Sequence, residues 1–362
     1  MRLAILSHPD CTLHKLGKTH PEIPERVKVI QDAIQIAPFY NNVDVITAPL
    51  VQKKQLYRAH DKSQVDYLFL NSPTAGTFII DHDTEMTPYT LQAAKRASGA
   101  VVKAVSLVLK NEYQQVFCNI RPPGHHASRN NAQGFCFFNN IAVGALHALE
   151  HENINRVAII DFDVHHGNGT EDIFAKDNRV KFFSSFEYPL YPNQAPHNRF
   201  ANINHSALKS GDNIEKIKKQ FKEKWLKELE EYQPDLIFIS AGFDAHKKDP
   251  YSTTQFESED YHWMTKQIMT VANKVCGGRV ISSLEGGYDL QALKESAIAH
   301  VQALMELPLD LKFLKKNSSA PALIQSPAPV IFSQALILDK ADAGPSGIKP
   351  RRSERIRKKS HR

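Results

Sequence analysis

Short runs of apolar and β-branched residues recur along most of this chain and are separated by longer, more polar segments. The runs occupy positions 3–6, 116–120, 157–164, 180–184, 236–240 and 280–284. Several are continuously apolar rather than alternating with polar residues, which is typical of parallel strands covered on both faces of a sheet. We therefore expect six strands of one buried, mainly parallel sheet.

The segments between these runs carry apolar residues at helical spacing. Residues 213–232 show it most clearly, because their apolar side chains form one stripe opposite a face rich in Lys and Glu. Similar patterns predict helices at 88–110, 139–150, 259–275 and 290–307. Strands that alternate with helices in this way predict a three-layer α/β/α fold in a single domain, which we place at residues 1–314.

The pattern fades beyond residue 314. Residues 315–348 contain several Pro, Ser, Ala and Gly residues and are interpreted as a linker. A short apolar piece at 330–338 interrupts this linker, and we expect it to dock on the domain or to pair with an edge strand. The last segment, 349–362, holds eight Lys and Arg residues against one Glu and forms a basic tail.

Composition limits the class of protein. The net charge of +6 comes from the basic tail, because the rest of the chain holds 37 basic and 38 acidic residues. No apolar run approaches the roughly 18 residues that a membrane-spanning helix needs, so we expect no membrane partner. The four cysteines are scattered without a closely spaced pair, which favours a reducing compartment over a disulfide framework.

Polar residues suited to metal binding follow two of the predicted strands. Asp163 and His165 lie two positions apart, and in extended backbone such side chains point the same way, so they can form half of a zinc site. Asp244 follows the strand at 236–240 and can supply a third ligand. Three protein ligands leave one position open, which is the catalytic arrangement. The pair alone is a weak signal, because most such pairs are surface or capping residues.

Two other strand ends carry groups suited to hydrolysis. His125 and His126 lie in a Pro- and Gly-containing loop, where one imidazole can act as a general base beside the other. After the strand at 280–284, two glycines allow close backbone approach and Tyr288 offers a hydroxyl to an oxyanion. Taken singly, these are more often a surface histidine pair and a packed aromatic. Together, the four strand ends favour a metal-dependent hydrolase.

The segments RPPGHHA, GFCFFNN, DFDVHHGNGT, AGFDA and LEGGYDL occur in this order. In combination they resemble the zinc-dependent histone deacetylase family, in its class II-like branch with the arginase/deacetylase fold. The sequence HPE at 20–22, with Pro24 and Arg26 nearby, resembles the amino-terminal motif of the same branch. The resemblance covers about residues 1–310 and implies hydrolysis of N6-acetyl-lysine in proteins, histone tails above all, with release of acetate.

The resemblance implies two bound metals. Asp163, His165 and Asp244 would hold one zinc ion per subunit, which polarises the acetyl carbonyl and lowers the pKa of water. A structural potassium ion is expected near Asp161, Asp163, His165 and Ser184, partly through main-chain carbonyls.

The resemblance also implies the catalytic roles. His126 would be the general base and then the acid, and His125, oriented by Asp161, would be its electrostatic partner. Tyr288 would hydrogen-bond the oxyanion, and its presence argues for activity, because class II members with His at this position are poor deacetylases. Asn168 would be the partner of His126 where class I members have Asp, and we expect this neutral partner to leave the pKa of the imidazole lower.

Four residues are expected to contact the substrate. By the same resemblance, Phe135 and Tyr191 would line an apolar tunnel for the lysine stem, and the backbone of Gly134 would accept from the substrate amide. Polyamine-selective relatives carry an acidic residue where this chain has Tyr251, so an uncharged rim favours acetyl-lysine in a peptide. The alternatives are an acetylpolyamine or non-histone protein deacetylase and a low-activity acetyl-lysine reader or repressor scaffold.

The basic tail has three interpretations: a nuclear import signal, a nucleic-acid anchor, or a solvated end. Its lack of interleaved aromatic residues argues against base stacking. We expect an import signal, and hence a nuclear rather than cytoplasmic location and contact of the tail with chromatin or an import receptor. A compact domain with such a tail also fits a bacterial effector that works in a host nucleus. The oligomeric state is not determined by the sequence.

Overall fold

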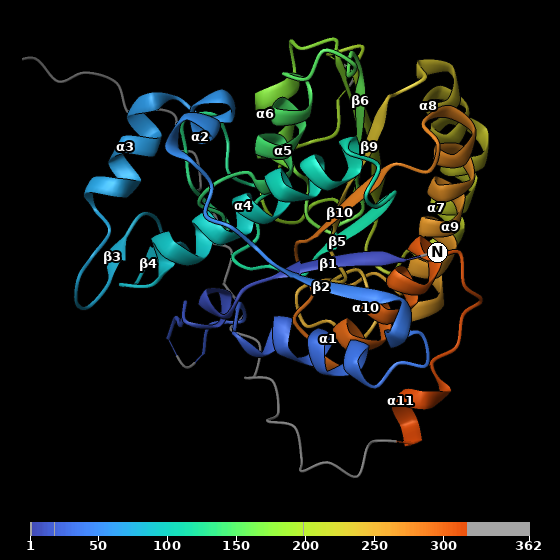
Figure 1. Ribbon diagram of the computed structural model, residues 1–362, viewed down its shortest axis with the longest axis horizontal. Helices are drawn as coiled ribbons and strands as arrows, with labels where there is room; N and C mark the ends of the chain where they lie inside the picture. Colours follow the sequence, from blue (N-terminus) through green and yellow to red (C-terminus); the bar gives the residue numbers. More distant parts are fainter. Residues whose placement is uncertain (1, 18, 198, 317–362) are drawn as a thin grey trace, which may run out of the picture. The chain divides into compact units, whose positions relative to one another are not determined.

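An eight-stranded sheet forms the centre of the computed structural model, which describes residues 2–17, 19–197 and 199–316 (Figure 1). Its strand order is β2-β1-β5-β10-β9-β6-β7-β8, and every pairing is parallel. The strands are β1 (Leu3–Ser7), β2 (Val43–Thr47), β5 (Gln115–Cys118), β6 (Val157–Asp161), β7 (Val180–Glu187), β8 (Ile203–Leu208), β9 (Leu236–Ala241) and β10 (Val280–Leu284). A small antiparallel pair, β3 (Phe78–Ile79) with β4 (Glu85–Met86), lies outside this sheet.

Helices cover both faces of the sheet. One face packs against α1 (Glu25–Gln35), α7 (Ile214–Gln220), α8 (Leu226–Tyr232), α9 (Ser258–Val275) and α10 (Leu290–Leu304). The other packs against α4 (Thr90–Leu109), α5 (Asn140–Ala148) and α6 (Asn168–Phe174). In the same hydrophobic core, α2 (Lys53–Ala59) packs on α5, and α3 (Lys62–Leu70) packs on α2. A last short helix, α11 (Lys312–Lys316), ends the described part of the chain. The expected three-layer α/β/α fold in a single domain is confirmed.

The helical layers on both faces of the sheet explain the continuous apolar runs. In β9, Ile237 and Ile239 belong to one hydrophobic core, while Leu236 and Phe238 belong to the other. Successive side chains of a strand point to opposite faces, so a strand between two helical layers needs apolar residues at every position.

The six expected strands and five expected helices are present, with end points that shift by a few residues. The expected helix at 213–232 is divided into α7, a π turn at Phe221–Trp225, and α8. The sequence did not predict the two edge strands, β2 and β8, because edge strands are covered less completely and mix polar with apolar residues. The helices α1, α2, α3 and α6 were not predicted either.

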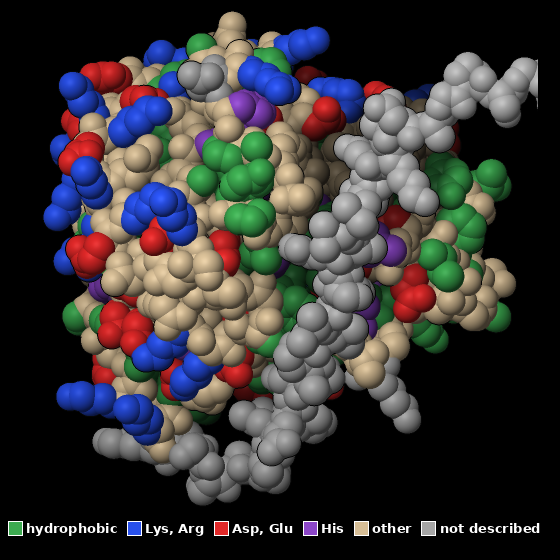
Figure 2. Space-filling model, turned by 180° about the vertical axis from the view of Figure 1, so that it is seen from behind, with side chains coloured by type: hydrophobic (Ala, Val, Ile, Leu, Met, Phe, Trp, Pro, Cys, Tyr) green, Lys and Arg blue, Asp and Glu red, His purple; other side chains and the backbone are tan. Residues whose placement is uncertain are grey.

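Of the expected linker, residues 315 and 316 belong to the end of α11. Residues 317–348, the apolar piece at 330–338 and the basic tail lie outside the described residues. None of the described helices combines the length and the apolar character that crossing a membrane requires. On the face shown in Figure 2, Lys and Arg side chains are interspersed with Asp and Glu rather than gathered in one patch. This mixture agrees with the neutral charge balance of the domain outside its tail.

Candidate active site

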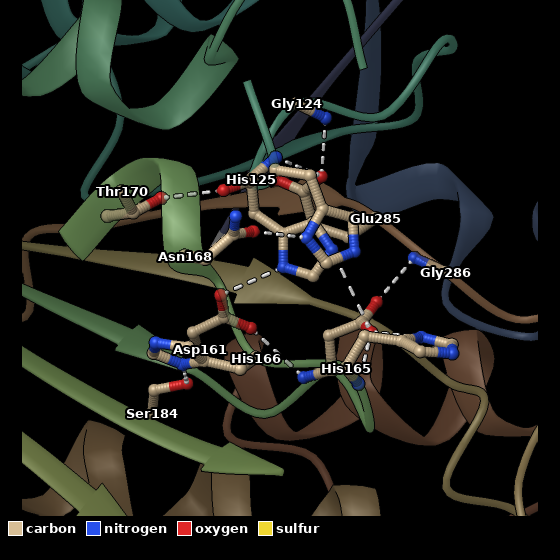
Figure 3. Close-up of polar contacts among 12 residues, drawn as sticks. Gly124, His125, Asp161, His165, His166, Asn168, Thr170, Ser184, Glu285 and Gly286 are labelled. Atoms are coloured by element: carbon tan, nitrogen blue, oxygen red, sulfur yellow. Dashed lines mark hydrogen bonds and ion pairs between the residues drawn. The ribbon is translucent and has the colours of Figure 1, made fainter. Parts of the chain in front are cut away.

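The candidate residues lie in loops that leave the carboxyl ends of neighbouring strands. The loop after β5 carries His125 and His126, and β6 ends at Asp161. Asp244 follows β9, and Tyr288 follows β10. Because parallel strands all end at the same edge, these loops meet there, which is where ligands usually bind in such sheets (Figure 3).

Asp163, His165 and Asp244 form a compact group whose possible ligand atoms all lie within 4.8 Å of one another. The Nδ1 atom of His165 is 3.1 Å from Asp163 Oδ1 and 3.1 Å from Asp244 Oδ2. Both carboxylates are fully buried. Burial disfavours a charged imidazole, but hydrogen bonds and charges of the two carboxylates hold the pKa of His165 well above its usual range. Surroundings that stabilise a proton on this nitrogen also favour a metal cation, which competes for the same lone pair.

Glycines allow the backbone to approach these carboxylates closely. A Cβ atom at Gly286 would lie 2.0 Å from Asp244 Oδ2, and one at Gly242 would lie 2.0 Å from Asp163 Oδ2. The backbone N–H of Gly286 donates to Asp163 Oδ2 at 2.7 Å. Any larger residue at these two positions would displace a candidate metal ligand.

The two adjacent histidines have different partners. His125 Nδ1 is 3.0 Å from Asp161 Oδ2, and His126 Nδ1 is 2.8 Å from Asn168 Oδ1. Both partner atoms are acceptors, so each Nδ1 carries a proton. Burial opposes a charge on His125, but Asp163 and Asp161 raise its pKa to about 10.

The pKa of His126 lies well below its usual range. Burial is the main cause, followed by the charges of His125 and His165. The hydrogen bond to Asn168 acts in the opposite direction. That Asn168 raises this pKa less than an Asp partner would stays a prediction. With its proton on Nδ1, neutral His126 offers the lone pair of Nε2 as a base.

Tyr288 lies beside the candidate metal ligands and is 7% exposed. Its ring centroid is 4.9 Å from the Arg26 guanidinium. Burial raises the pKa of Tyr288 well above its usual range; Arg26 opposes this shift, and Asp244 and Asp163 add to it. The phenol therefore stays protonated and can donate a hydrogen bond.

The four expected substrate-contact residues surround His126 and Tyr288. The Tyr191 ring stands edge-on to His126 at 4.9 Å, and the Tyr251 ring lies 5.0 Å from that of Tyr288. The Phe135 ring lies 6.2 Å from Tyr288. Gly134 has φ +56°, and a Cβ atom there would be 2.6 Å from His126 Cδ2. Both the backbone conformation and the lack of space therefore favour glycine at this position.

Ser184 is placed next to Asp161, because the two residues are partners in the β6–β7 register. The Ser184 hydroxyl lies 3.0 Å from Nδ1 of His166, the residue after His165. The expected potassium residues are thus neighbours in the fold.

Three buried charged residues connect the loops and were not assigned a role from the sequence. Arg121 Nε donates to Glu22 Oε1 at 2.6 Å, and Arg26 Nη1 donates to the same oxygen at 3.1 Å. Arg26 Nε also donates to the carbonyl of Gly287 at 2.7 Å. The side chains of all three charged residues are fully buried. They therefore link the histidine loop to the Tyr288 loop through α1.

Glu285 makes a second link between the same loops. Its Oε2 atom accepts from the backbone N–H of Gly124 at 2.6 Å and of His125 at 3.2 Å (Figure 3). Burial raises the pKa of Glu285 to about 7. The only sequence signal for these residues was a charged side chain inside or beside a motif.

A second group that could hold a metal lies nearby, formed by His166, Glu171 and His205. Nε2 of His166 and Nε2 of His205 are 3.0 Å and 2.6 Å from Glu171 Oε2. However, His205 Nδ1 accepts the backbone N–H of His197 at 3.1 Å, so the proton of neutral His205 must sit on Nε2. That proton faces Glu171, and the group is a hydrogen-bonded cluster rather than a ligand set.

Comparison with known proteins identifies the family. The histone deacetylase domain profile matches residues 20–304. The chain is 34% identical over 348 residues to type-2 histone deacetylase 2 of Dictyostelium discoideum. The match covers 83% of this chain but only 20% of that protein. It is 34% identical over 312 residues to an uncharacterized protein of Synechocystis, covering 84% of this chain and 99% of that one.

Further relatives agree. Histone deacetylase 14, chloroplastic, of Arabidopsis thaliana is 32% identical over 313 residues, which cover 80% of this chain and 73% of that protein. Among solved structures, the crystal structure of the HDA15 HD domain matches with a TM-score of 0.79 and 28% identity, covering 87% of this chain and 91% of that one. With the domain profile matched over most of its length, this chain belongs to the histone deacetylase family.

Proposed function

We propose that this chain is a zinc-dependent lysine deacetylase that hydrolyses N6-acetyl-lysine in proteins, most of all in histone tails, and releases acetate. The observation that carries the proposal is the convergence of the Asp163, His165 and Asp244 group with His126 and Tyr288 at one edge of the sheet. Family membership supports the same reaction class.

The donor set suits zinc. Two carboxylates and one imidazole within 4.8 Å of one another are a catalytic type of ligand set, with a position left for substrate. When bound, zinc supplies a Lewis acid that polarises the acetyl carbonyl and lowers the pKa of water. Asp163, His165 and Asp244 are the residues that would hold it. We also propose a potassium ion beside Asp161 and Ser184.

The remaining groups transfer the proton or stabilise charge during the reaction. His126 Nε2 takes the proton of the attacking water and then gives it to the lysine nitrogen as the C–N bond breaks. Asn168 accepts from Nδ1 and so keeps Nε2 free for this transfer. The Tyr288 hydroxyl donates to the oxyanion that forms on the acetyl carbonyl. His125, held by Asp161, supplies a positive charge beside His126.

The residues around the site favour an acetyl-lysine in a peptide over an acetylated polyamine. Phe135, Tyr191 and Tyr251 are uncharged aromatic residues, which suit the methylene stem of lysine, and Tyr251 offers no carboxylate to pair with a polyamine cation. We also propose that the basic tail directs the chain to the nucleus, where acetylated histones and chromatin are its partners.

The test is deacetylation of acetylated histone peptides, a non-histone acetylated peptide and acetylated polyamines by the zinc-loaded protein and by Tyr288→Phe. We expect turnover of histone peptides that falls by roughly 100-fold or more in the variant, as for loss of one oxyanion donor. Turnover of polyamines alone would refute the protein substrate. Absence of all turnover would favour the reader or scaffold alternative.

A further inference from the structure

Asp249 is a buried carboxylate that accepts three backbone hydrogen bonds beside the site. It lies five positions after Asp244 and is 5% exposed. Its Oδ2 atom accepts from the N–H of Tyr288 at 2.6 Å and from that of Asp289 at 3.2 Å. Its Oδ1 atom accepts from the N–H of Tyr251 at 3.0 Å.

These bonds join two segments that are distant in the sequence. Tyr251 belongs to the connection between β9 and α9, whereas Tyr288 and Asp289 connect β10 to α10. Asp289 is the N-cap of α10, because its side chain accepts from Ala292 N at 2.7 Å. The Asp249 carboxylate therefore fixes the backbone of Tyr288 between the end of a strand and the start of a helix.

The position of this backbone sets the position of the Tyr288 hydroxyl. The rigid aromatic ring connects the backbone to the hydroxyl, so a shift of the backbone shifts the hydroxyl. Gly286 and Gly287, just before Tyr288, leave the loop itself flexible. A donor displaced by about 1 Å from a developing oxyanion loses much of its effect. The hydroxyl therefore needs a fixed backbone to reach its full effect.

We propose that Asp249 is a positioning residue that acts on the reaction through Tyr288. The inference rests on the proposed function of Tyr288 as the oxyanion donor. It predicts that Asp249 matters for the chemical step only when the Tyr288 hydroxyl is present.

The test is a double-mutant cycle of Asp249→Asn with Tyr288→Phe in the zinc-loaded chain. Asn has the size of Asp, but its NH2 group cannot accept, so one of the two sides of the carboxylate loses its acceptor. A matched control is Asp235→Asn. Asp235 Oδ2 accepts the N–H groups of Asn155 and Arg156 at 2.8 and 2.9 Å, at the opposite ends of the strands.

We expect Asp249→Asn to lower kcat by roughly 10- to 100-fold, a part of the effect of losing an oxyanion donor. KM should change by less than about threefold, because the interaction lost is made in the transition state. In the Tyr288→Phe background the same substitution should change kcat by less than about twofold. Asp235→Asn should leave kcat unchanged in both backgrounds.

Asp249→Glu is measured in parallel, because it keeps the carboxyl group and moves it by one methylene group. Zinc content and melting temperature show which variants are folded, and single-turnover assays with excess enzyme detect the slow variants. Equal losses of kcat in the two backgrounds would overturn the inference, as would full kcat in both folded Asp249 variants. An inactive wild type, or full activity of Tyr288→Phe, would instead refute the proposed function.

Discussion

Replacement of Glu22 by Gln is expected to destabilise the fold and to loosen both catalytic loops. The Glu22 carboxylate lies between the guanidinium groups of Arg26 and Arg121, and all three side chains are fully buried. Gln removes the negative charge and leaves two buried guanidinium groups without the carboxylate that pairs with them. Arg26 also holds the carbonyl of Gly287, so the Tyr288 loop should move as well.

The pKa of Glu22 gives the size of the effect. Burial opposes ionisation, but Arg121 and then Arg26 lower the pKa from 4.5 to about 2. This difference corresponds to about 3 kcal/mol of stability, close to the roughly 3–5 kcal/mol lost when one partner of a buried ion pair is removed. Because the folded pKa is depressed, this stability is present above about pH 4.5 and is lost as the pH falls through about 2.

The measurement is the free energy of unfolding in urea at pH 7, followed by circular dichroism, together with kcat on an acetylated peptide. Asp66→Asn is the control, since Asp66 pairs with Lys53 and Lys62 at the surface and its loss should shift the unfolding midpoint far less. A loss of less than about 1 kcal/mol in Glu22→Gln would contradict the buried-triad argument.

Three further outcomes follow from other parts of the structure. The purified chain should bind one zinc ion by elemental analysis, and Asp163→Ala should lose this ion while Glu171→Ala keeps it. A second ion in wild type that is lost in Glu171→Ala would contradict the proton assignment in the His205 cluster. Burial lowers the pKa of His300 from 6.5 to about 3, so its neutral form stabilises the fold above pH 6.5 and the stability falls towards pH 3, by at most about 1.4 kcal/mol per pH unit. His300→Gln should make unfolding free energy less steep over that range, and an unchanged slope would refute this. Gly286→Ala should abolish zinc binding, because its Cβ would meet a ligand carboxylate at 2.0 Å, while Gly17→Ala, with open space around it, should bind zinc normally.

The sequence alone determined the layers of the fold and the residues that meet in the candidate site. Central strands reveal themselves by continuous apolar runs, because both faces are covered. Asp163 and His165 were recognisable from their spacing directly after a predicted strand, although β6 ends at Asp161 and both residues lie in the loop that follows it. Asp244, His126 and Tyr288 follow other strands, and parallel strands bring their ends to a common edge.

Only the tertiary structure showed what holds these residues in place. Glu22 and Arg121 are 99 positions apart, and Asp249 and Tyr288 are 39 apart. Glu22, Arg121 and Asp249 are residue types that usually lie at the surface, and their burial depends on partners supplied by other elements. The spacing of neighbouring residues follows from covalent geometry and can be read from the sequence. The pairing of residues from distant segments depends on the order of the strands in the sheet, which only the tertiary structure shows.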